Sequence, residues 1–450
     1  MKETDTICAP ATAIGGALSI IRVSGPTALQ TVGAVGTVAC QEAEANTVHY
    51  GHIKDGGRIV DEVMISVFRS PRSYTGEDSV EITCHGSRYI LKKVLELLIQ
   101  HGCRMAEPGE FTLRAYLNGK MDLSQAEAVA DLIASTNGAT HRMAMNQLRG
   151  GISTELSRLR EKLLKLTSLL ELELDFSDHE DLEFADRSEL RDLAATLLTH
   201  VGKLADSFET GEAIKHGIPV AIVGKTNVGK STLLNRLLGD DRAIVSDIHG
   251  TTRDTIEDTI DLHGVTFRFI DTAGLRMTDD EVERIGIART WQAIEKARIV
   301  IWLTDAEPTE EEAAEMASRC KGKRLLAVRN KIDLEGGEQE KDTPTPPSLG
   351  ISAKQNLHIE ELKEAIYEAA GLPELQESDV IVSSARHYAL LASAHDDLER
   401  VLGALEEGLP GDLVAEDLRI ALDKLSEITG GAITTDEVLG NIFKNFCVGK

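Results

Sequence analysis

The chain has 450 residues, of which 42% are hydrophobic, and its formal net charge is −26. This length suits about three domains with real cores, and the acidic balance argues against broad, unspecific nucleic-acid binding, because phosphate contacts need clustered Lys and Arg. No apolar run approaches the roughly 20 residues that span a bilayer, and the six scattered cysteines form no CxxC pair, so we expect a cytoplasmic protein without a membrane segment, disulfide framework or structural zinc site.

Residues 1–120 have the pattern of a mixed α/β domain. Ala17–Ser24, Ile59–Phe68 and Ser79–Thr83 are rich in β-branched and apolar residues and predict strands. Tyr89–Gln100 predicts a helix. The polar stretches between these elements read as surface loops, and composition gives them no further role.

From residue 121 to about 215 the pattern is helical. Apolar residues recur at alternating spacings of four and three: Ile152, Leu156, Leu159, Leu163, Leu166 and Leu170. This repeat predicts a long amphipathic helix that packs on other helices. A further helix is predicted at about 187–208.

The stretch Gly-Lys-Thr-Asn-Val-Gly-Lys-Ser at 224–231 lies between an apolar, β-branched run and a segment with helical spacing. Its glycines allow successive N–H groups to converge on a phosphate, and the helix that follows adds its positive end. Lys230 would reach the β- and γ-phosphate oxygens, and Ser231 would bind Mg²⁺. An ordinary Gly-rich turn before a helix is the alternative. The combination of strand, loop, Lys-Ser and helix favours a phosphate-binding loop.

Three further motifs follow in the order that a GTPase needs: Asp271-Thr272-Ala273-Gly274, Asn330-Lys331-Ile332-Asp333 and Ser352-Ala353-Lys354. Asp271 is expected in the Mg²⁺ shell, with the Gly274 N–H near the γ-phosphate. The Asp333 carboxylate can accept hydrogen bonds from guanine N1–H and the 2-amino group, which adenine lacks, and the last motif supplies a backbone N–H for O6. The four motifs predict a GTP-binding domain built on a doubly wound sheet.

Two details of these motifs bear on the mechanism. Leu275 stands where Ras-like GTPases have a glutamine that orients the attacking water, so that role passes to another residue. Candidates in the same stretch are Arg276, Glu281, Glu283 and Arg284, unless these are solvated charges on a helix. The Asn227 carbonyl, together with carbonyls of the switch stretch 246–254, could also enclose a monovalent cation that supplies the charge of an arginine finger.

The predicted GTP-binding set joins the phosphate loop, the switch stretch and the three motifs. It comprises Asn227, Val228, Gly229, Lys230, Ser231, Thr232, Ser246, Asp247, Ile248, His249, Gly250, Thr251, Thr252, Asp271, Thr272, Ala273, Gly274, Asn330, Lys331, Asp333, Ser352, Ala353 and Lys354.

A second helical block follows the GTPase unit, with helices expected at 385–405, 414–429 and 436–446. Because helical segments flank the GTPase unit on both sides, it can be an insertion in one helical domain. The chain ends in Phe446-Cys447-Val448-Gly449-Lys450. Cys447 could be a nucleophile, part of a binding site or a packed residue, and the sequence leaves these open.

Over essentially its whole length the chain resembles the TrmE (MnmE, ThdF) family of tRNA-modification GTPases, within the TrmE-Era-EngA-like group. The resemblance is carried by the phosphate loop, by 250–254, by 271–276 with 280–286, and by the C-terminal five residues, where the family usually has isoleucine at position 448.

The resemblance implies an α/β and all-α multidomain fold. Residues 1–120 would form an α+β folate-binding and dimerisation domain, 121–215 and 373–450 a helical bundle, and 216–372 an inserted Ras-like P-loop GTPase. A tetrahydrofolate derivative, 5-formyl- or 5,10-methylene-tetrahydrofolate, would contact Arg22, Glu81, Lys120 and Lys450.

For catalysis the resemblance implies Mg²⁺ on Ser231 and Thr252, and K⁺ on Asn227, Ser246, Ile248 and Thr251. Glu283 would orient water, with Asn227, Lys230 and Cys447 as further catalytic candidates. GTPase domains would pair across a homodimer. With the flavoprotein MnmG, in a heterotetramer or larger complex, the protein would add aminomethyl or carboxymethylaminomethyl groups to C5 of the tRNA wobble uridine, leaving much of the tRNA binding to that partner.

Two other functions compete with this one. The chain could be a regulatory GTPase switch without one-carbon chemistry, or a stand-alone folate-dependent methyltransferase with a GTPase appendage. Folate binding by the N-terminal segment distinguishes the regulatory switch from the leading interpretation, because the switch needs no folate. Formation of the modified uridine without any flavoprotein would favour the stand-alone methyltransferase.

Overall fold

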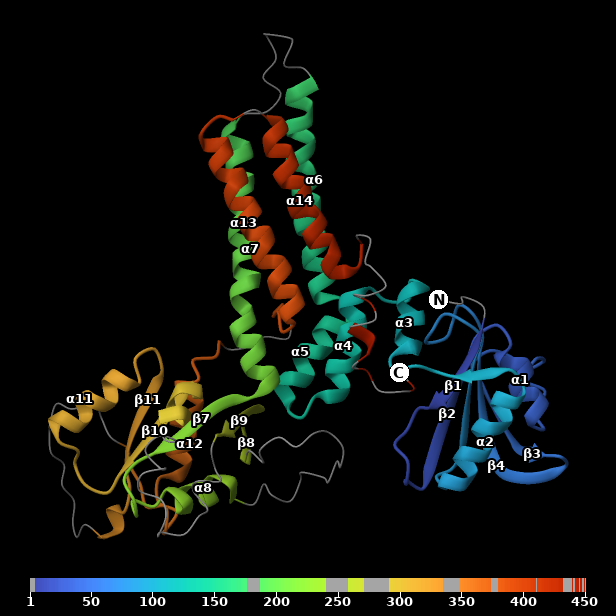
Figure 1. The fold of residues 1–450 in the computed structure, drawn as a ribbon, viewed down its shortest axis with the longest axis horizontal. Helices are drawn as coiled ribbons and strands as arrows, with labels where there is room; N and C mark the ends of the chain where they lie inside the picture. The colour runs from blue at the N-terminus through green and yellow to red at the C-terminus, as the bar shows by residue number, and fades with distance from the viewer. Residues whose placement is uncertain are drawn as a thin grey trace. The chain divides into compact units, whose positions relative to one another are not determined.

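The computed structural model (Figure 1) describes residues 5–175, 187–239, 258–270, 291–334, 349–373, 379–409, 411–431, 439, 442–444, 446 and 449. They form two compact units. The first comprises Met1–Ala134, Ala144–Lys203 and Ala389–Lys450, and the second comprises Ser135–Met143 and Leu204–Tyr388. Among the described residues, no helix combines the length and hydropathy needed to cross a membrane.

The N-terminal part of the first unit is a six-stranded sheet in the order β3-β4-β5-β2-β1-β6. Its strands are β1 (Thr6–Pro10), β2 (Leu18–Ser24), β3 (Thr47–Asp55), β4 (Arg58–Phe68), β5 (Ser79–His85) and β6 (Cys103–Met105). The strands expected at 17–24, 59–68 and 79–83 are confirmed as β2, β4 and β5. The sequence reading missed β1, β3 and β6.

Helices cover the two faces of this sheet unequally. Alternate strand residues such as Ile21, Ile65 and Ile82 share a buried core with α1 (Ala28–Val35) and α2 (Arg88–Gln100). On the other face, Ile7 and Ala9 pack against α3 (Glu110–Leu117). The helix predicted at 89–100 is thus confirmed as α2.

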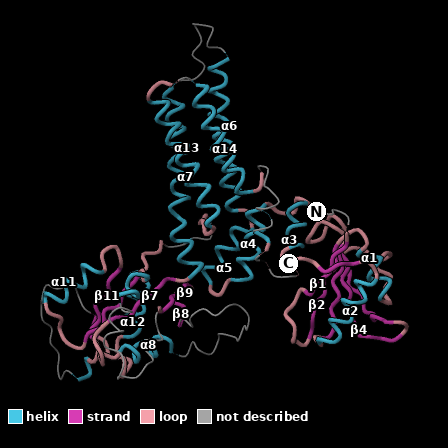
Figure 2. The backbone as a smooth tube through the Cα atoms, in the orientation of Figure 1, coloured by secondary structure: helices cyan, strands magenta, loops and turns pink. Residues whose placement is uncertain are grey.

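The helical part of the chain consists of long helices, drawn in cyan in Figure 2. They are α4 (Leu123–Ala134), α5 (Gly138–Leu148), α6 (Gly151–Asp175), α7 (Arg187–His216), α13 (Ala385–Glu406) and α14 (Gly411–Thr429). Every member of the predicted leucine series on α6 is buried, and α6 packs along α14. The helices expected at 385–405 and 414–429 are confirmed, α7 runs past the predicted end at 208, and most of 436–446 lies outside the described residues.

The second unit contains a six-stranded sheet in the order β12-β11-β10-β7-β9-β8. Its strands are β7 (Ile218–Val223), β8 (Asp258–Leu262), β9 (Val265–Phe269), β10 (Ile299–Thr304), β11 (Arg324–Arg329) and β12 (Leu349–Gly350). The pairs from β12 through β7 to β9 are parallel, and β8 joins antiparallel at the edge.

Apolar cores lie on both faces of this sheet. One includes residues of α8 (Lys230–Leu238) and α12 (Ile359–Ala369). The other includes Ala293, Ile294, Ala297 and Cys320, which follows α11 (Glu310–Arg319). Sheets covered on both faces characterise doubly wound α/β domains. The predicted fold class, with an α+β sheet, a helical domain and a doubly wound domain, is confirmed.

Candidate nucleotide-binding site

The loop 224–229 connects β7 to α8 and depends on two glycines. A Cβ atom at Gly224 would lie 2.2 Å from the Leu303 carbonyl oxygen, and one at Gly229 would lie 2.4 Å from Asn330 Nδ2. Gly229 has a φ of 98° and caps α8, while Asn227 adopts a left-handed φ of 64°. The backbone therefore turns tightly into the helix, in the arrangement that brings N–H groups together around a phosphate.

Lys230 lies across this loop. Its Nζ donates hydrogen bonds to the carbonyls of Gly224, at 2.8 Å, and Lys225, at 2.7 Å. Burial lowers the pKa of the Lys230 ammonium group. The neighbouring Ser231 and Thr232 are exposed at the start of α8, whereas Val228 is buried in the core. An ammonium group held inside the loop can exchange these carbonyls for phosphate oxygens.

The buried Asn330 fastens the phosphate loop to the third motif. Its Nδ2 donates to the Val228 carbonyl at 2.8 Å, and its Oδ1 accepts from the Ala353 N–H at 3.0 Å. Ser352 is buried beside them. Motifs more than a hundred residues apart in sequence are thus brought into one site.

Lys331 and Asp333, also predicted to contact the base, are half-buried. Lys331 has a φ of 68°, and its Nζ forms an ion pair with Asp305 Oδ2 at 2.9 Å. Asp333 lies on the short helix η2 (Ile332–Leu334), where its Oδ2 accepts a long hydrogen bond of 3.4 Å from Gln355 Nε2. Both atoms of this contact are exposed, so a guanine edge can compete for the carboxylate.

Several predicted residues fall outside the described part of the chain. They are Ser246, Asp247, Ile248, His249, Gly250, Thr251, Thr252, Asp271, Thr272, Ala273, Gly274, Glu283, Cys447 and Lys450. Their predicted roles stay predictions.

Sequence reading missed two cations in this unit. Lys225 Nζ pairs at 2.6 Å with Glu312, which belongs to a capping box with Thr309 at the start of α11. Arg236 on α8 donates to the carbonyls of Ala353 and Lys354. The Thr-x-x-Glu spacing was a usable signal for the capping box. Nothing local in the sequence marks Arg236.

A second candidate site lies on the N-terminal sheet around Arg22. Its Nε and Nη2 donate to Glu81 Oε1 at 2.9 and 2.8 Å, across paired strands, and its Nη1 donates to the Gly449 carbonyl at 3.2 Å. The guanidinium also lies 5.1 Å from the ring centre of Tyr74 and 5.7 Å from that of Phe111. Sequence reading missed both aromatic residues, although Tyr74 stands out as the aromatic in a polar loop.

The other described member of the predicted folate set is Lys120. Its Nζ donates to the Pro71 carbonyl at 2.8 Å. Gly449 has a φ of 95°, and a Cβ atom there would lie 2.0 Å from the Pro10 carbonyl oxygen. Gly449 therefore lies closely against the end of β1, and only glycine fits at that contact.

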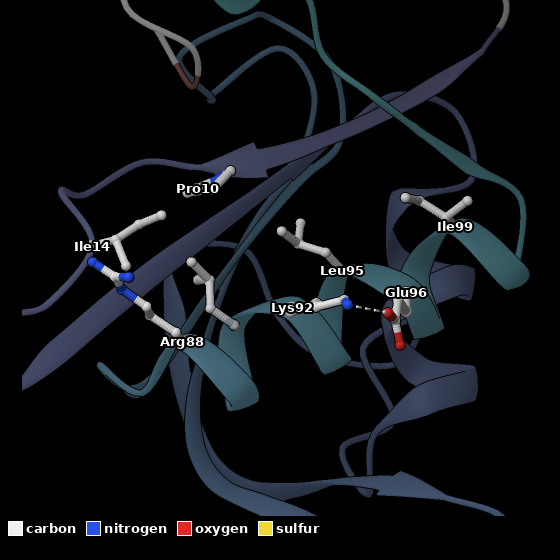
Figure 3. Close-up of a pocket in the computed structure, with 8 residues that line it drawn as sticks. Pro10, Ile14, Arg88, Lys92, Leu95, Glu96 and Ile99 are labelled. Atoms are coloured by element: carbon white, nitrogen blue, oxygen red, sulfur yellow. Dashed lines mark ion pairs between the residues drawn. The ribbon is translucent and has the colours of Figure 1, made fainter.

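A cavity of about 490 Å³ lies beside α2 (Figure 3) and is lined by Pro10, Ile14, Arg88, Leu91, Lys92, Leu95, Glu96 and Ile99. Ala9 pairs with Arg22 and packs beside Phe111. The next side chain, Pro10, points to the opposite face, which α1 and α2 cover. The cavity is thus on the opposite face of the sheet from Arg22 and Glu81. It does not coincide with the predicted folate site.

Comparison with protein-family models gives two matches. Residues 123–447 match the model described as "MnmE helical domain", and residues 6–120 match the one described as "GTP-binding protein TrmE N-terminus". Together these matches cover almost the whole chain.

Among curated proteins, the chain is 52% identical to the tRNA modification GTPase MnmE of Bacteroides fragilis, covering 99% of both chains. It is 50% identical to the protein of that name from Phocaeicola vulgatus, covering all of both. The solved FeoB G-domain from Methanococcus jannaschii is 30% identical over 34% of this chain and 98% of that one, with a TM-score of 0.25. Because that match spans only about a third of this chain, the sequence matches carry the assignment.

Proposed function

The chain belongs to the MnmE family of tRNA-modification GTPases, and from this premise we propose that its GTP hydrolysis is potassium-dependent and drives a folate-dependent modification. The protein is a GTP hydrolase that acts in tRNA modification. With the flavoprotein MnmG it would add aminomethyl or carboxymethylaminomethyl groups to C5 of the wobble uridine. We propose that it works in the cytoplasm as a homodimer, with the domains bounded as predicted, and that MnmG supplies much of the tRNA binding.

The observation that carries the folate part of the proposal is the convergence of Arg22, Glu81 and Gly449. This cluster joins a cation, a carboxylate and the backbone carbonyl of Gly449. Because Arg22 and Glu81 contact each other, they would meet one end of a tetrahydrofolate. The carboxylate suits the hydrogen-bonding edge of the pterin ring, and the guanidinium would hold that carboxylate in place. Tyr74 adds an aromatic surface of the kind on which flat rings stack.

The phosphate loop is suited to the proposed cations. Ser231 offers a hydroxyl oxygen for Mg²⁺, with Thr252 as its partner, and Asn227 offers an amide oxygen for K⁺, with Ser246, Ile248 and Thr251. Oxygen ligands of this kind suit both hard cations. The bound cations would neutralise charge on the phosphates, and Glu283 would orient the attacking water.

One observation favours the second candidate function, a regulatory switch without one-carbon chemistry. Arg22 is already paired with Glu81 and with the Gly449 carbonyl. Such a pairing can serve to fasten the C-terminus alone, since a half-buried arginine needs partners whether or not a ligand binds.

An Arg22→Ala variant distinguishes the two functions. We expect it to weaken binding of 5-formyl-tetrahydrofolate at least tenfold, measured by calorimetry, and to abolish the modified uridine measured by nucleoside mass spectrometry, because a charged hydrogen-bond donor is lost. GTP turnover should persist. Arg69→Ala is a matched control, since Arg69 donates to the carbonyls of Gln41 and Ala43 in the same domain. A native protein that binds no folate, with a variant that still supports modification, would favour the switch.

A further inference from the structure

The side chain of Arg236 holds two consecutive carbonyls of the loop that follows β12. Its Nε donates to the Ala353 carbonyl at 3.1 Å, and its Nη2 donates to the Lys354 carbonyl at 3.2 Å. Arg236 lies on α8, the helix that begins at the phosphate loop. One side chain therefore connects the helix at the phosphates to the loop predicted to contact the base.

These two bonds fix the directions of the N–H groups that follow. In a trans peptide the C=O and the next N–H point in opposite directions. Holding the Ala353 carbonyl thus turns the Lys354 N–H away from Arg236, and holding the Lys354 carbonyl turns away the Gln355 N–H. The Gln355 N–H donates to Ser352 Oγ at 3.1 Å.

Among residues 353–355, the Lys354 N–H is the backbone donor with no hydrogen bond in the described part of the chain. The Ala353 N–H is taken by Asn330 Oδ1 at 3.0 Å, and the Gln355 N–H is taken by Ser352. Within the described part of the chain, the Lys354 N–H makes no backbone hydrogen bond. A free N–H on a loop fastened at both ends is a ready donor for a ligand oxygen.

We propose that Arg236 is a positioning residue of the guanine site, which directs the Lys354 N–H at the O6 atom of the base. This inference rests on the proposed assignment of Ser352-Ala353-Lys354 as the base pocket. Asn330 links the same loop to the Val228 carbonyl, so the O6 donor is fixed relative to the phosphate loop at two points. Arginine suits the task because its planar fork can span two neighbouring carbonyls, whereas lysine offers a single point charge.

The test compares GDP with two analogues in the full-length protein. In 6-thio-GDP a sulfur, which is a weaker acceptor, replaces O6, and IDP lacks the 2-amino group that Asp333 is predicted to bind. For Arg236→Ala we expect about tenfold weaker GDP binding, as for the loss of one hydrogen bond between the protein and the base. The affinity for 6-thio-GDP should fall less than the affinity for GDP, so the ratio of the two affinities becomes smaller. The preference for GDP over IDP should stay unchanged.

Two further variants complete the experiment. Arg236→Lys should recover only part of the GDP affinity. Arg298→Ala is the matched control, because Arg298 also donates to a backbone carbonyl, that of Ala370 at 3.2 Å. This residue directly precedes β10, which runs parallel to β7, so it lies at the end of the sheet opposite the phosphate loop. The control variant should leave all three affinities unchanged.

The Arg236 variants test the positioning role, and an Asp333 variant tests the assignment of the base pocket. Equal losses for GDP and 6-thio-GDP in Arg236→Ala would mean a structural role only, and no loss at all would mean no role; either result overturns the proposal. If Asp333→Asn leaves the preference for GDP over IDP unchanged, the assignment of the base pocket itself fails.

Discussion

Glu110 illustrates how single charges are arranged in the N-terminal domain. It is 8% exposed, its carboxylate accepts from Arg104 and Arg114, and Arg114 also donates to Asp5 at 2.7 Å. Burial raises the pKa of Glu110, but the hydrogen bonds from Arg104, the Glu107 N–H and Arg114 outweigh it, so the net pKa lies below the ordinary 4.5. The ionised form is therefore favoured in the folded state.

This depressed pKa predicts an acid-sensitive contribution to stability. A carboxylate with a lowered folded pKa stabilises fully above its unfolded pKa, about 4.5, and loses that contribution as pH falls toward the folded pKa. Glu110→Gln should cost about 2 kcal/mol at pH 7 and clearly less at acidic pH. Hydrogen exchange of peptides covering α3 measures this loss of stability locally.

The control for this prediction is Glu96→Gln, because Glu96 forms an exposed pair with Lys92 at 3.7 Å in the same domain. Exposed pairs contribute little, so this variant should behave as the native protein. A Glu110→Gln penalty that is equally large at pH 7 and at acidic pH would contradict the ionic explanation.

At the scale of elements, the start of α5 docks on the hairpin between β8 and β9. The Ala139 N–H donates to the Gly264 carbonyl at 2.9 Å, and Asn137 Nδ2 donates to Thr266 Oγ1 at 2.7 Å. Ala139 is 1% exposed and belongs to the core of the second unit. This contact explains why Ser135–Met143 belongs to that unit, far from it in sequence.

Removing the Asn137 side chain should loosen this contact. Asn137 Oδ1 also accepts from the Thr140 N–H, so Asn137→Ala loses both a helix cap and the bridge to the hairpin. We expect local destabilisation of about 1–2 kcal/mol. Hydrogen exchange should accelerate in peptides covering 135–148 and 258–269.

Ser157→Ala serves as the control, because Ser157 makes an exposed hydrogen bond to the Ser153 carbonyl on α6. Ser157→Ala should leave the exchange rates of 135–148 and 258–269 unchanged. Faster exchange in α5 with an unchanged hairpin would show that Asn137 acts as a cap alone.

At the scale of the whole molecule, the nucleotide site is expected to depend on a cation and on a second copy of the chain. Leu275 supplies no water-orienting amide, so charge and water positioning must come from elsewhere. We expect the rate of GTP hydrolysis per chain to be higher in potassium than in sodium and to rise with protein concentration. Asn227→Ala should remove the difference between the two ions while GDP still binds.

The test measures the rate of GTP hydrolysis per chain against potassium or sodium concentration and against protein concentration. A matched control is Asn118→Ala, because Asn118 donates to the Thr75 carbonyl in the N-terminal domain and lies in the other unit. Rapid turnover in sodium, independent of protein concentration, would contradict the prediction.

The local sequence determined the helices, strands and loops that depend on interactions between residues close together in the chain. The β-branched runs before 224 and at 59–68 predicted strands, the leucine spacing predicted α6, and the glycines at 224 and 229 predicted the phosphate loop, because each depends on neighbours within a few residues. The motifs also predicted a GTPase, since their residue types carry the chemistry.

Tertiary structure decided which distant residues meet. Arg22 reaches the Gly449 carbonyl, Ala139 joins the β8–β9 hairpin, and Arg236 holds the base loop, although each partner is separated by more than a hundred residues. Such contacts leave no periodic trace in the sequence, because one polar side chain pairing with one backbone carbonyl constrains only two positions. The sequence thus determined the elements and the chemistry, and the packing of these elements decided which side chains hold the site in place.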